Sequence, residues 1–131
     1  KQLKINDEVK FIGSKLQNEV KDMLCKAKIF CLPSVITESG SREGIPLALM
    51  EAMAMELAVV STNIVGIPEL IKDRKEGILV EPKNIHMIAD ALALLLKDDC
   101  MRKNYGKAAR KKIIKEFNIE KVPKEFSIIF K

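Results

Sequence analysis

Two carboxylates stand eight residues apart around the start of an apolar segment. Glu43 precedes Gly44 and Pro46, and Glu51 lies within residues 47–55, which are rich in strong helix formers. A helix that starts near Pro46 offers free backbone amides and the positive end of its dipole, both of which suit a diphosphate. Carboxylates fit beside a diphosphate only if they accept hydrogen bonds from neutral hydroxyls, as a ribose or a sugar provides. The spacing therefore predicts a site for an anionic ligand that is rich in hydroxyl groups.

Short apolar segments that are expected to form strands alternate with helical patterns, and they lie at residues 9–13, 29–32, 58–62 and 77–80. Ser14 and Gln17 have the spacing of a capping box, and Asn84 is expected to cap a later helix. This alternation predicts an α/β fold, with a parallel Rossmann-like sheet and helices on both faces. Ligands of such sheets bind beyond the carboxyl ends of the strands.

Length and composition predict one domain. The chain has 131 residues, of which 47% are apolar, and a last helical segment is expected at residues 118–131. Its three cysteines form no C-x-x-C pair, which favours a reducing compartment and therefore the cytoplasm. No apolar run is long enough to span a bilayer, no secretory leader is expected at the start, and no cluster of metal ligands is apparent.

Positive charge is concentrated near the end of the chain. Residues 1–96 carry 12 basic and 13 acidic side chains, whereas residues 97–131 carry 11 basic and 5 acidic side chains. Nucleic acid, an anionic membrane surface and solvation alone are all compatible with such a basic region. No nucleic-acid partner is expected, and contact with the inner face of a membrane is kept as an alternative to plain solvation.

The segment around the two carboxylates resembles the E-x7-E motif of glycosyltransferase family 4, as Glu43-x7-Glu51. Matches in the same order surround it and extend the resemblance over about residues 8–117; they lie at residues 9–13, 30–34, 51–54, 65–70 and 77–80. The motif belongs to the C-terminal half of the GT-B fold. The resemblance implies a partial donor-binding domain over residues 1–131, with its first strands and an N-terminal acceptor-binding domain missing.

The resemblance also implies roles for individual residues. Glu51 is expected to hold ribose hydroxyls, and Glu43 is expected to contact the donor sugar as the catalytic residue. The other expected donor-binding residues either supply amides to the sugar and diphosphate or border the base; they are Gly44, Ile45, Pro46, Leu47, Gly13, Pro33 and Ser34.

The implied activity is that of a retaining hexosyltransferase that needs no metal or other cofactor. Such an enzyme moves a sugar from a nucleotide diphosphate to a saccharide or lipid-linked acceptor, here in polysaccharide biosynthesis, and this fragment alone is expected to be inactive. Two alternatives stay open. One is a non-catalytic nucleotide-sugar-binding or assembly module, and the other is a GT-B nucleotide-sugar epimerase.

Two positions depart from the family pattern. Glu56 stands where the family usually has Gly, and Ala58 stands where it usually has Pro. Glu56 is expected just past the end of a helix, where a left-handed backbone is favoured. A residue other than glycine costs about 1–2 kcal/mol in that conformation. We therefore expect a weakened turn at Glu56, but no loss of a ligand-binding group.

Overall fold

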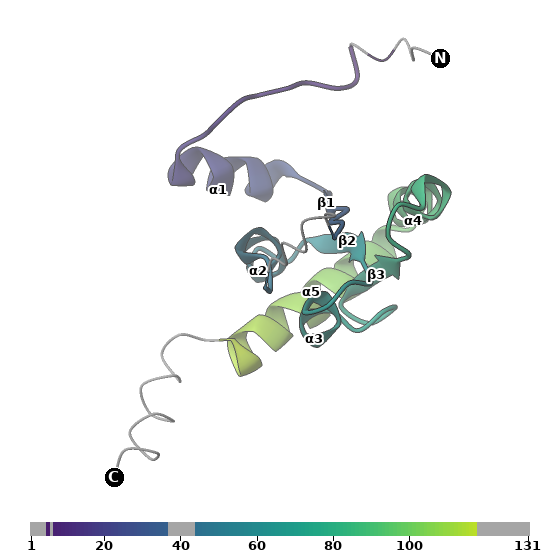
Figure 1. Cartoon of the computed structure of the whole chain (residues 1–131). Helices are drawn as coiled ribbons and strands as arrows, with labels where there is room; N and C mark the ends of the chain where they lie inside the picture. Colours follow the sequence, from purple (N-terminus) through teal and green to yellow (C-terminus); the bar gives the residue numbers. More distant parts are fainter. Residues whose placement is uncertain (1–4, 6, 37–43, 118–131) are drawn as a thin grey trace.

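Three parallel strands form the centre of the molecule in the computed structural model, which describes residues 5, 7–36 and 44–117 (Figure 1). The elements are, in chain order, α1 (Gln17–Lys26), β1 (Ile29–Leu32), α2 (Leu47–Ala54), β2 (Ala58–Thr62), α3 (Ile67–Leu70), β3 (Gly77–Val80), α4 (Ile85–Lys97) and α5 (Asp99–Glu116). The predicted α/β class and three of the four expected strands are confirmed. The expected segment at residues 118–131 lies outside the described residues.

The strands pair in the order β1-β2-β3, so β2 lies in the middle of the sheet. Phe30 of β1 stands opposite Val59 of β2, which in turn stands opposite Gly77 of β3. A Cβ atom on Gly77 would lie 2.5 Å from the carbonyl oxygen of Val59. The close approach of β2 and β3 at this point therefore requires glycine.

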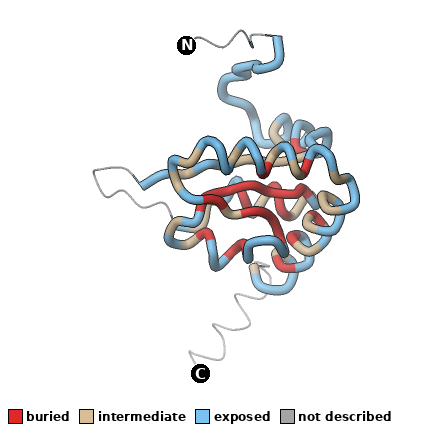
Figure 2. The backbone as a smooth tube through the Cα atoms, turned by 90° about the vertical axis from the view of Figure 1, so that its right-hand side faces the viewer, coloured by how far each residue is buried: buried red, intermediate tan, exposed pale blue. Residues whose placement is uncertain are grey.

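Helices cover both faces of the sheet, as the sequence predicted. Val59 points into a cluster that α2, α3 and α5 complete, with Leu49 and Met53 of α2 fully buried. Val60 points to the other face, where α4 contributes Ala91 and Leu95. Figure 2 shows the buried residues concentrated along the inner strands, with exposed helix surfaces outside them. Alternate residues of β2 thus belong to two cores, and this explains why the strand is apolar on both faces.

The expected strand at residues 9–13 is wrong. These residues are exposed and have no strand pairing, and Phe11 is 99% exposed. In Figure 1 the segment runs away from the sheet. A strand needs a neighbouring ladder to satisfy its backbone groups, and none of the three described strands lies beside this segment.

The sequence predicted the N-cap of α4 correctly and the capping box of α1 incorrectly. Asn84 caps α4 as expected, because its side-chain oxygen accepts the Met87 backbone N–H at 3.1 Å. The capping box at Ser14 and Gln17 is wrong, since α1 begins only at Gln17. The Glu19 carboxylate accepts the Leu16 backbone N–H at 2.8 Å instead and satisfies the start of that helix.

The C-terminal end of α2 is packed against α5. Glu56 has the expected left-handed backbone, with φ 61°, and its carbonyl oxygen would lie 2.0 Å from a Cβ atom on Gly106. Arg110 of α5 donates a hydrogen bond to the carbonyl oxygen of Ala54 and lies 3.8 Å from the Glu56 carboxylate. The turn that the family usually builds with glycine therefore forms here with Glu56.

Candidate functional site

The backbone amides at the start of α2 make no helical hydrogen bond. Pro46 is the N-cap with φ −65°, and no side chain caps this helix in the part of the chain that is described. The Leu49 backbone N–H donates the first helical hydrogen bond, to the Pro46 carbonyl oxygen at 3.1 Å. The backbone N–H groups before Leu49 therefore have no acceptor within the helix. Gly44 and Leu47 are exposed, whereas Ile45 and Pro46 are half-buried.

A second loop lies against this helix start. Gly66 precedes α3 with φ 95°, and a Cβ atom built on it would lie 3.6 Å from the Gly44 carbonyl carbon and 3.7 Å from the Ile45 nitrogen. The loops before α2 and α3 are therefore neighbours at the same end of the sheet. Gly66 lies within the family match at residues 65–70, but the sequence analysis did not name it as a site residue. A glycine just before a helix was the feature that could have identified it.

The loop after β1 is tied to β2 by two buried hydroxyl groups. The Thr62 hydroxyl donates to the Ser34 carbonyl oxygen at 2.6 Å, and the Ser61 hydroxyl donates to the Leu32 carbonyl oxygen at 2.8 Å. Ser34 is half-buried and Pro33 is exposed. These bonds hold the predicted site residues of this loop beside the end of β2. Sequence reasoning missed Ser61 and Thr62, although two hydroxyls at the end of an apolar strand were a visible signal.

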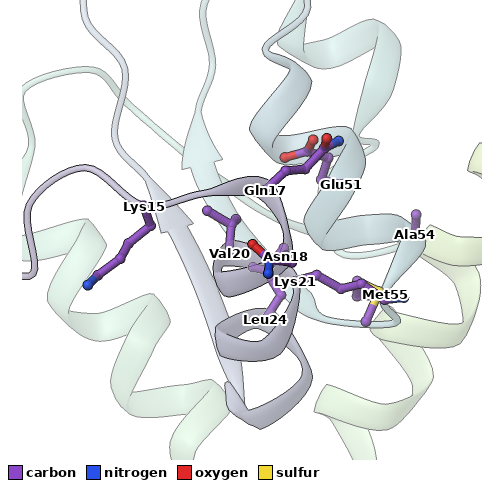
Figure 3. Close-up of a pocket in the computed structure, with 9 residues that line it drawn as sticks. All are labelled: Lys15, Gln17, Asn18, Val20, Lys21, Leu24, Glu51, Ala54 and Met55. Carbon is purple, nitrogen blue, oxygen red and sulfur yellow. The ribbon is translucent and has the colours of Figure 1, made fainter.

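Glu51 is half-buried and lines a cavity of about 560 Å³ between α1 and α2 (Figure 3). In the figure its carboxylate points to the same end of the cavity as the side chain of Gln17. Polar and apolar groups share the lining, which also contains Lys15, Asn18, Val20, Lys21, Leu24, Ala54 and Met55. The volume falls within the range of about 300–1,000 Å³ that is usual for small-molecule sites.

Helix α2 both lines the cavity at Glu51 and provides the first-turn backbone amides. Glu51 is four residues after Leu47, which corresponds to about 6 Å along the helix axis. Gly13 is exposed with φ 65° and precedes α1, two residues before Lys15 at the cavity wall. The arrangement can place an anionic group at the helix start and a hydroxyl-rich, partly apolar group beside Glu51.

Glu43, the predicted catalytic residue, lies outside the described residues. The assigned roles of Glu51, of residues 44–47, and of Gly13, Pro33 and Ser34 stay predictions. Among residues 5, 7–36 and 44–117, no group of three or more His, Cys, Asp or Glu side chains could hold a metal ion.

Solved structures with this fold define the class of the domain. The C-terminal domain of LpcC, a glycosyl transferase group 1 family protein from Francisella tularensis, aligns with a TM-score of 0.69 and 31% identity over 85% of this chain and 53% of that one. Sucrose-phosphate synthase from Thermosynechococcus elongatus aligns with a TM-score of 0.83 and 22% identity over 96% of this chain and 30% of that one. The fold is that of the Rossmann-like C-terminal domain of GT-B glycosyltransferases.

Sequence comparison assigns the family. The model described as "Glycosyl transferases group 1" matches residues 1–112, and the chain belongs to this family. The putative colanic acid biosynthesis glycosyltransferase WcaL of Escherichia coli is 41% identical over 127 residues, which are 96% of this chain and 31% of WcaL. The amylovoran biosynthesis glycosyltransferase AmsK of Erwinia amylovora is 43% identical over 114 residues, which are 87% of this chain and 28% of AmsK. The chain therefore spans about a third of the length of these relatives.

Proposed function

We propose that this chain is the donor-binding part of a retaining glycosyltransferase. The full protein would move a hexosyl group from a nucleotide diphosphate sugar to a saccharide or lipid-linked acceptor, which an N-terminal domain binds. The observation that carries the proposal is the half-buried Glu51 carboxylate, which lines a cavity one turn past a helix start that no described side chain caps.

Each part of the site has a proposed role. Glu51 accepts hydrogen bonds from the ribose hydroxyls, while the backbone N–H groups of Gly44, Ile45 and Leu47 donate to the sugar and the diphosphate. Gly13, Pro33 and Ser34 border the base. Glu43 contacts hydroxyls of the donor sugar next to the bond that breaks.

Catalysis in this proposal depends on positioning and on charge. The departing diphosphate takes the proton of the acceptor hydroxyl, so the chain needs no base of its own and no metal. The helix amides stabilise the negative charge that grows on the leaving group.

The names of relatives support the substrate classes. WcaL and AmsK are named for the polysaccharides colanic acid and amylovoran. A galactosyltransferase of Escherichia coli that is 33% identical over 105 residues is named for UDP-Gal and a diphosphoundecaprenol acceptor. TarM of Staphylococcus aureus, which aligns with a TM-score of 0.72 and 27% identity, was solved with UDP. We accordingly propose a cytoplasmic enzyme of polysaccharide biosynthesis.

Calorimetry on the full-length protein with UDP, GDP and ADP sugars tests the proposal. Glu51→Gln should weaken binding of the preferred nucleotide at least about tenfold, because a hydrogen bond to a charged group contributes about 1.5–3 kcal/mol. Asp90→Asn is the matched control, because it removes the same charge from an exposed position on α4. Glu43→Gln should mainly lower turnover.

The other outcomes are also informative. If no nucleotide sugar binds to the full-length protein, the proposed function is wrong. Binding without transfer to any acceptor would indicate the non-catalytic module. Conversion of the donor to an epimer would indicate the epimerase.

A further inference from the structure

One side of α5 carries cations on consecutive turns. Lys103, Lys107, Arg110 and Lys111 are all exposed, and their spacing places them on one side of a helix with 3.6 residues per turn. Residues 103–115 contain no acidic side chain. We call these four residues, together with Ile114, the basic face.

The acidic groups near the basic face only partly offset its charge. Asp99 forms an ion pair with Arg102 one turn before the face, and its other oxygen lies 3.8 Å from Lys103. The Glu56 carboxylate lies 3.8 Å from Arg110 and is about half-exposed. Lys107 and Lys111 have no acidic side chain one turn away along α5 in either direction. The face therefore keeps a positive excess.

More lysines stand next to the C-terminal end of this face. A groove of about 520 Å³ runs between α5 and the segment that follows α3, and it brings Lys72 and Lys75 to the same groove as Lys111. Three acidic residues, Glu69, Glu76 and Glu116, also line this groove, and the Lys75 ammonium group lies 3.8 Å from the Glu76 carboxylate. Lys112 also lines the groove, but its ammonium group donates to the Glu69 carbonyl oxygen at 2.8 Å and anchors α5. The carboxylate of the buried Glu76 accepts the Lys72 backbone N–H at 2.8 Å, and this hydrogen bond stabilises its negative charge within the loop.

An apolar side chain stands among these cations. Ile114 is 51% exposed and falls on the same side of α5 as Lys103 and Lys107. The aromatic residue Tyr105 is half-buried and packs against the core on the opposite side of the helix. Stacking on bases would need exposed aromatic groups, whereas lysines around an exposed aliphatic side chain suit the headgroup region of a bilayer.

We propose that the basic face docks on an anionic phospholipid bilayer. The lysine ammonium groups and Arg110 bind lipid phosphates, Ile114 reaches the edge of the acyl chains, and Lys72 extends the contact across the groove. None of these residues lines the cavity at Glu51. The proposal is therefore independent of the function proposed for that cavity.

Vesicle sedimentation with the full-length protein tests this docking. Binding is expected to vesicles of phosphatidylcholine mixed with phosphatidylglycerol but not to phosphatidylcholine alone, and it should weaken as salt is added. The triple variant K103Q/K107Q/K111Q should bind at least about tenfold more weakly, because each lysine near an anionic surface contributes to the attraction. The matched control is K10Q/K26Q/K28Q, which removes the same charge from exposed positions outside α5.

Three results would overturn the proposal. These are no sedimentation with the anionic vesicles, an equal loss in the control variant, and tighter binding of the basic face to RNA or DNA than to the vesicles at the same salt. Calorimetry with nucleotide sugars on the same triple variant should give unchanged affinity. That measurement separates a failure of membrane docking from a failure of the proposed function.

Discussion

β1 and β2 are both short, apolar and parallel, but their burial differs. All five residues of β2 are buried, whereas all four of β1 are only half-buried. β2 has a strand on each side and helices on both faces, while β1 lies at the edge of the three described strands beside α1, which contributes Leu24 as its single buried residue. Neighbouring strands and helices, and not the composition of a strand, therefore determine how far it is buried.

The cavity at Glu51 lies between α1, next to the half-buried strand β1, and α2, which belongs to the buried core. Helix α1 is on the loosely packed side, whereas Leu49 and Met53 of α2 belong to the well-packed core. One wall is therefore packed into the core, whereas the other contributes one buried residue, Leu24. This arrangement suits a site that must position a ligand and also admit it.

The largest expected effect lies on the well-packed side, at Gly106. Gly106→Ala should destabilise the chain by about 3 kcal/mol, because the new methyl group would collide with the Glu56 carbonyl at 2.0 Å and push α5 away from α2. Chemical denaturation measures this loss. Asn104→Ala, at an exposed position of the same helix, should change stability little. An unaltered stability of Gly106→Ala would mean that α2 and α5 are not in close contact.

The next effect concerns the link between the two strands. Thr62→Val should cost about 1–2 kcal/mol, since it leaves the Ser34 carbonyl without its hydroxyl partner. It should also weaken nucleotide-sugar binding by loosening the loop after β1. Thr62→Ser keeps the hydroxyl and is expected to restore most of both properties in thermal melting and calorimetry. If serine behaves like valine, the methyl group of Thr62 matters and the hydrogen bond does not.

A smaller effect, of opposite sign, is expected at Glu56. Glu56→Gly should stabilise the chain by about 1 kcal/mol, because glycine removes the strain of φ 61° and the lost ion pair to the exposed Arg110 contributes little. Thermal unfolding measures the gain. Glu56→Ala keeps a Cβ atom at this position and should show no such increase. A loss of stability in the glycine variant would show that the contact with Arg110 outweighs the strain.

The smallest effect tests the half-burial of β1 by thiol labelling. Burial raises the pKa of the Cys31 thiol and so lowers its reactive thiolate fraction at mildly alkaline pH, and burial also limits access of the reagent, whereas Cys25 and Cys100 are exposed. Labelling of Cys31 should be several-fold slower than labelling of the other two and should speed up as the pH rises towards its raised pKa. The three rates should become similar in denaturant. Equal rates in the folded chain would place β1 on the open surface.

Much of the fold could be predicted from the sequence because its signals are local. The apolar run at residues 58–62, the cap at Asn84 and the left-handed turn at Glu56 all follow from side chains close to one another in the chain. Residues 9–13 have an equally good strand pattern and yet form no strand, because pairing requires a neighbour that lies far away in sequence.

The α/β order, the helix start near Pro46 and the resemblance that pointed to Glu51 could all be recognised from the sequence. The cavity between Glu51 and α1, the approach of Gly66 to the loop at Gly44, and the hydrogen bond from Thr62 to Ser34 became visible only in the folded chain. The physical reason is that helix periodicity and capping act over a few residues, whereas these contacts join residues that are brought together only when the sheet assembles.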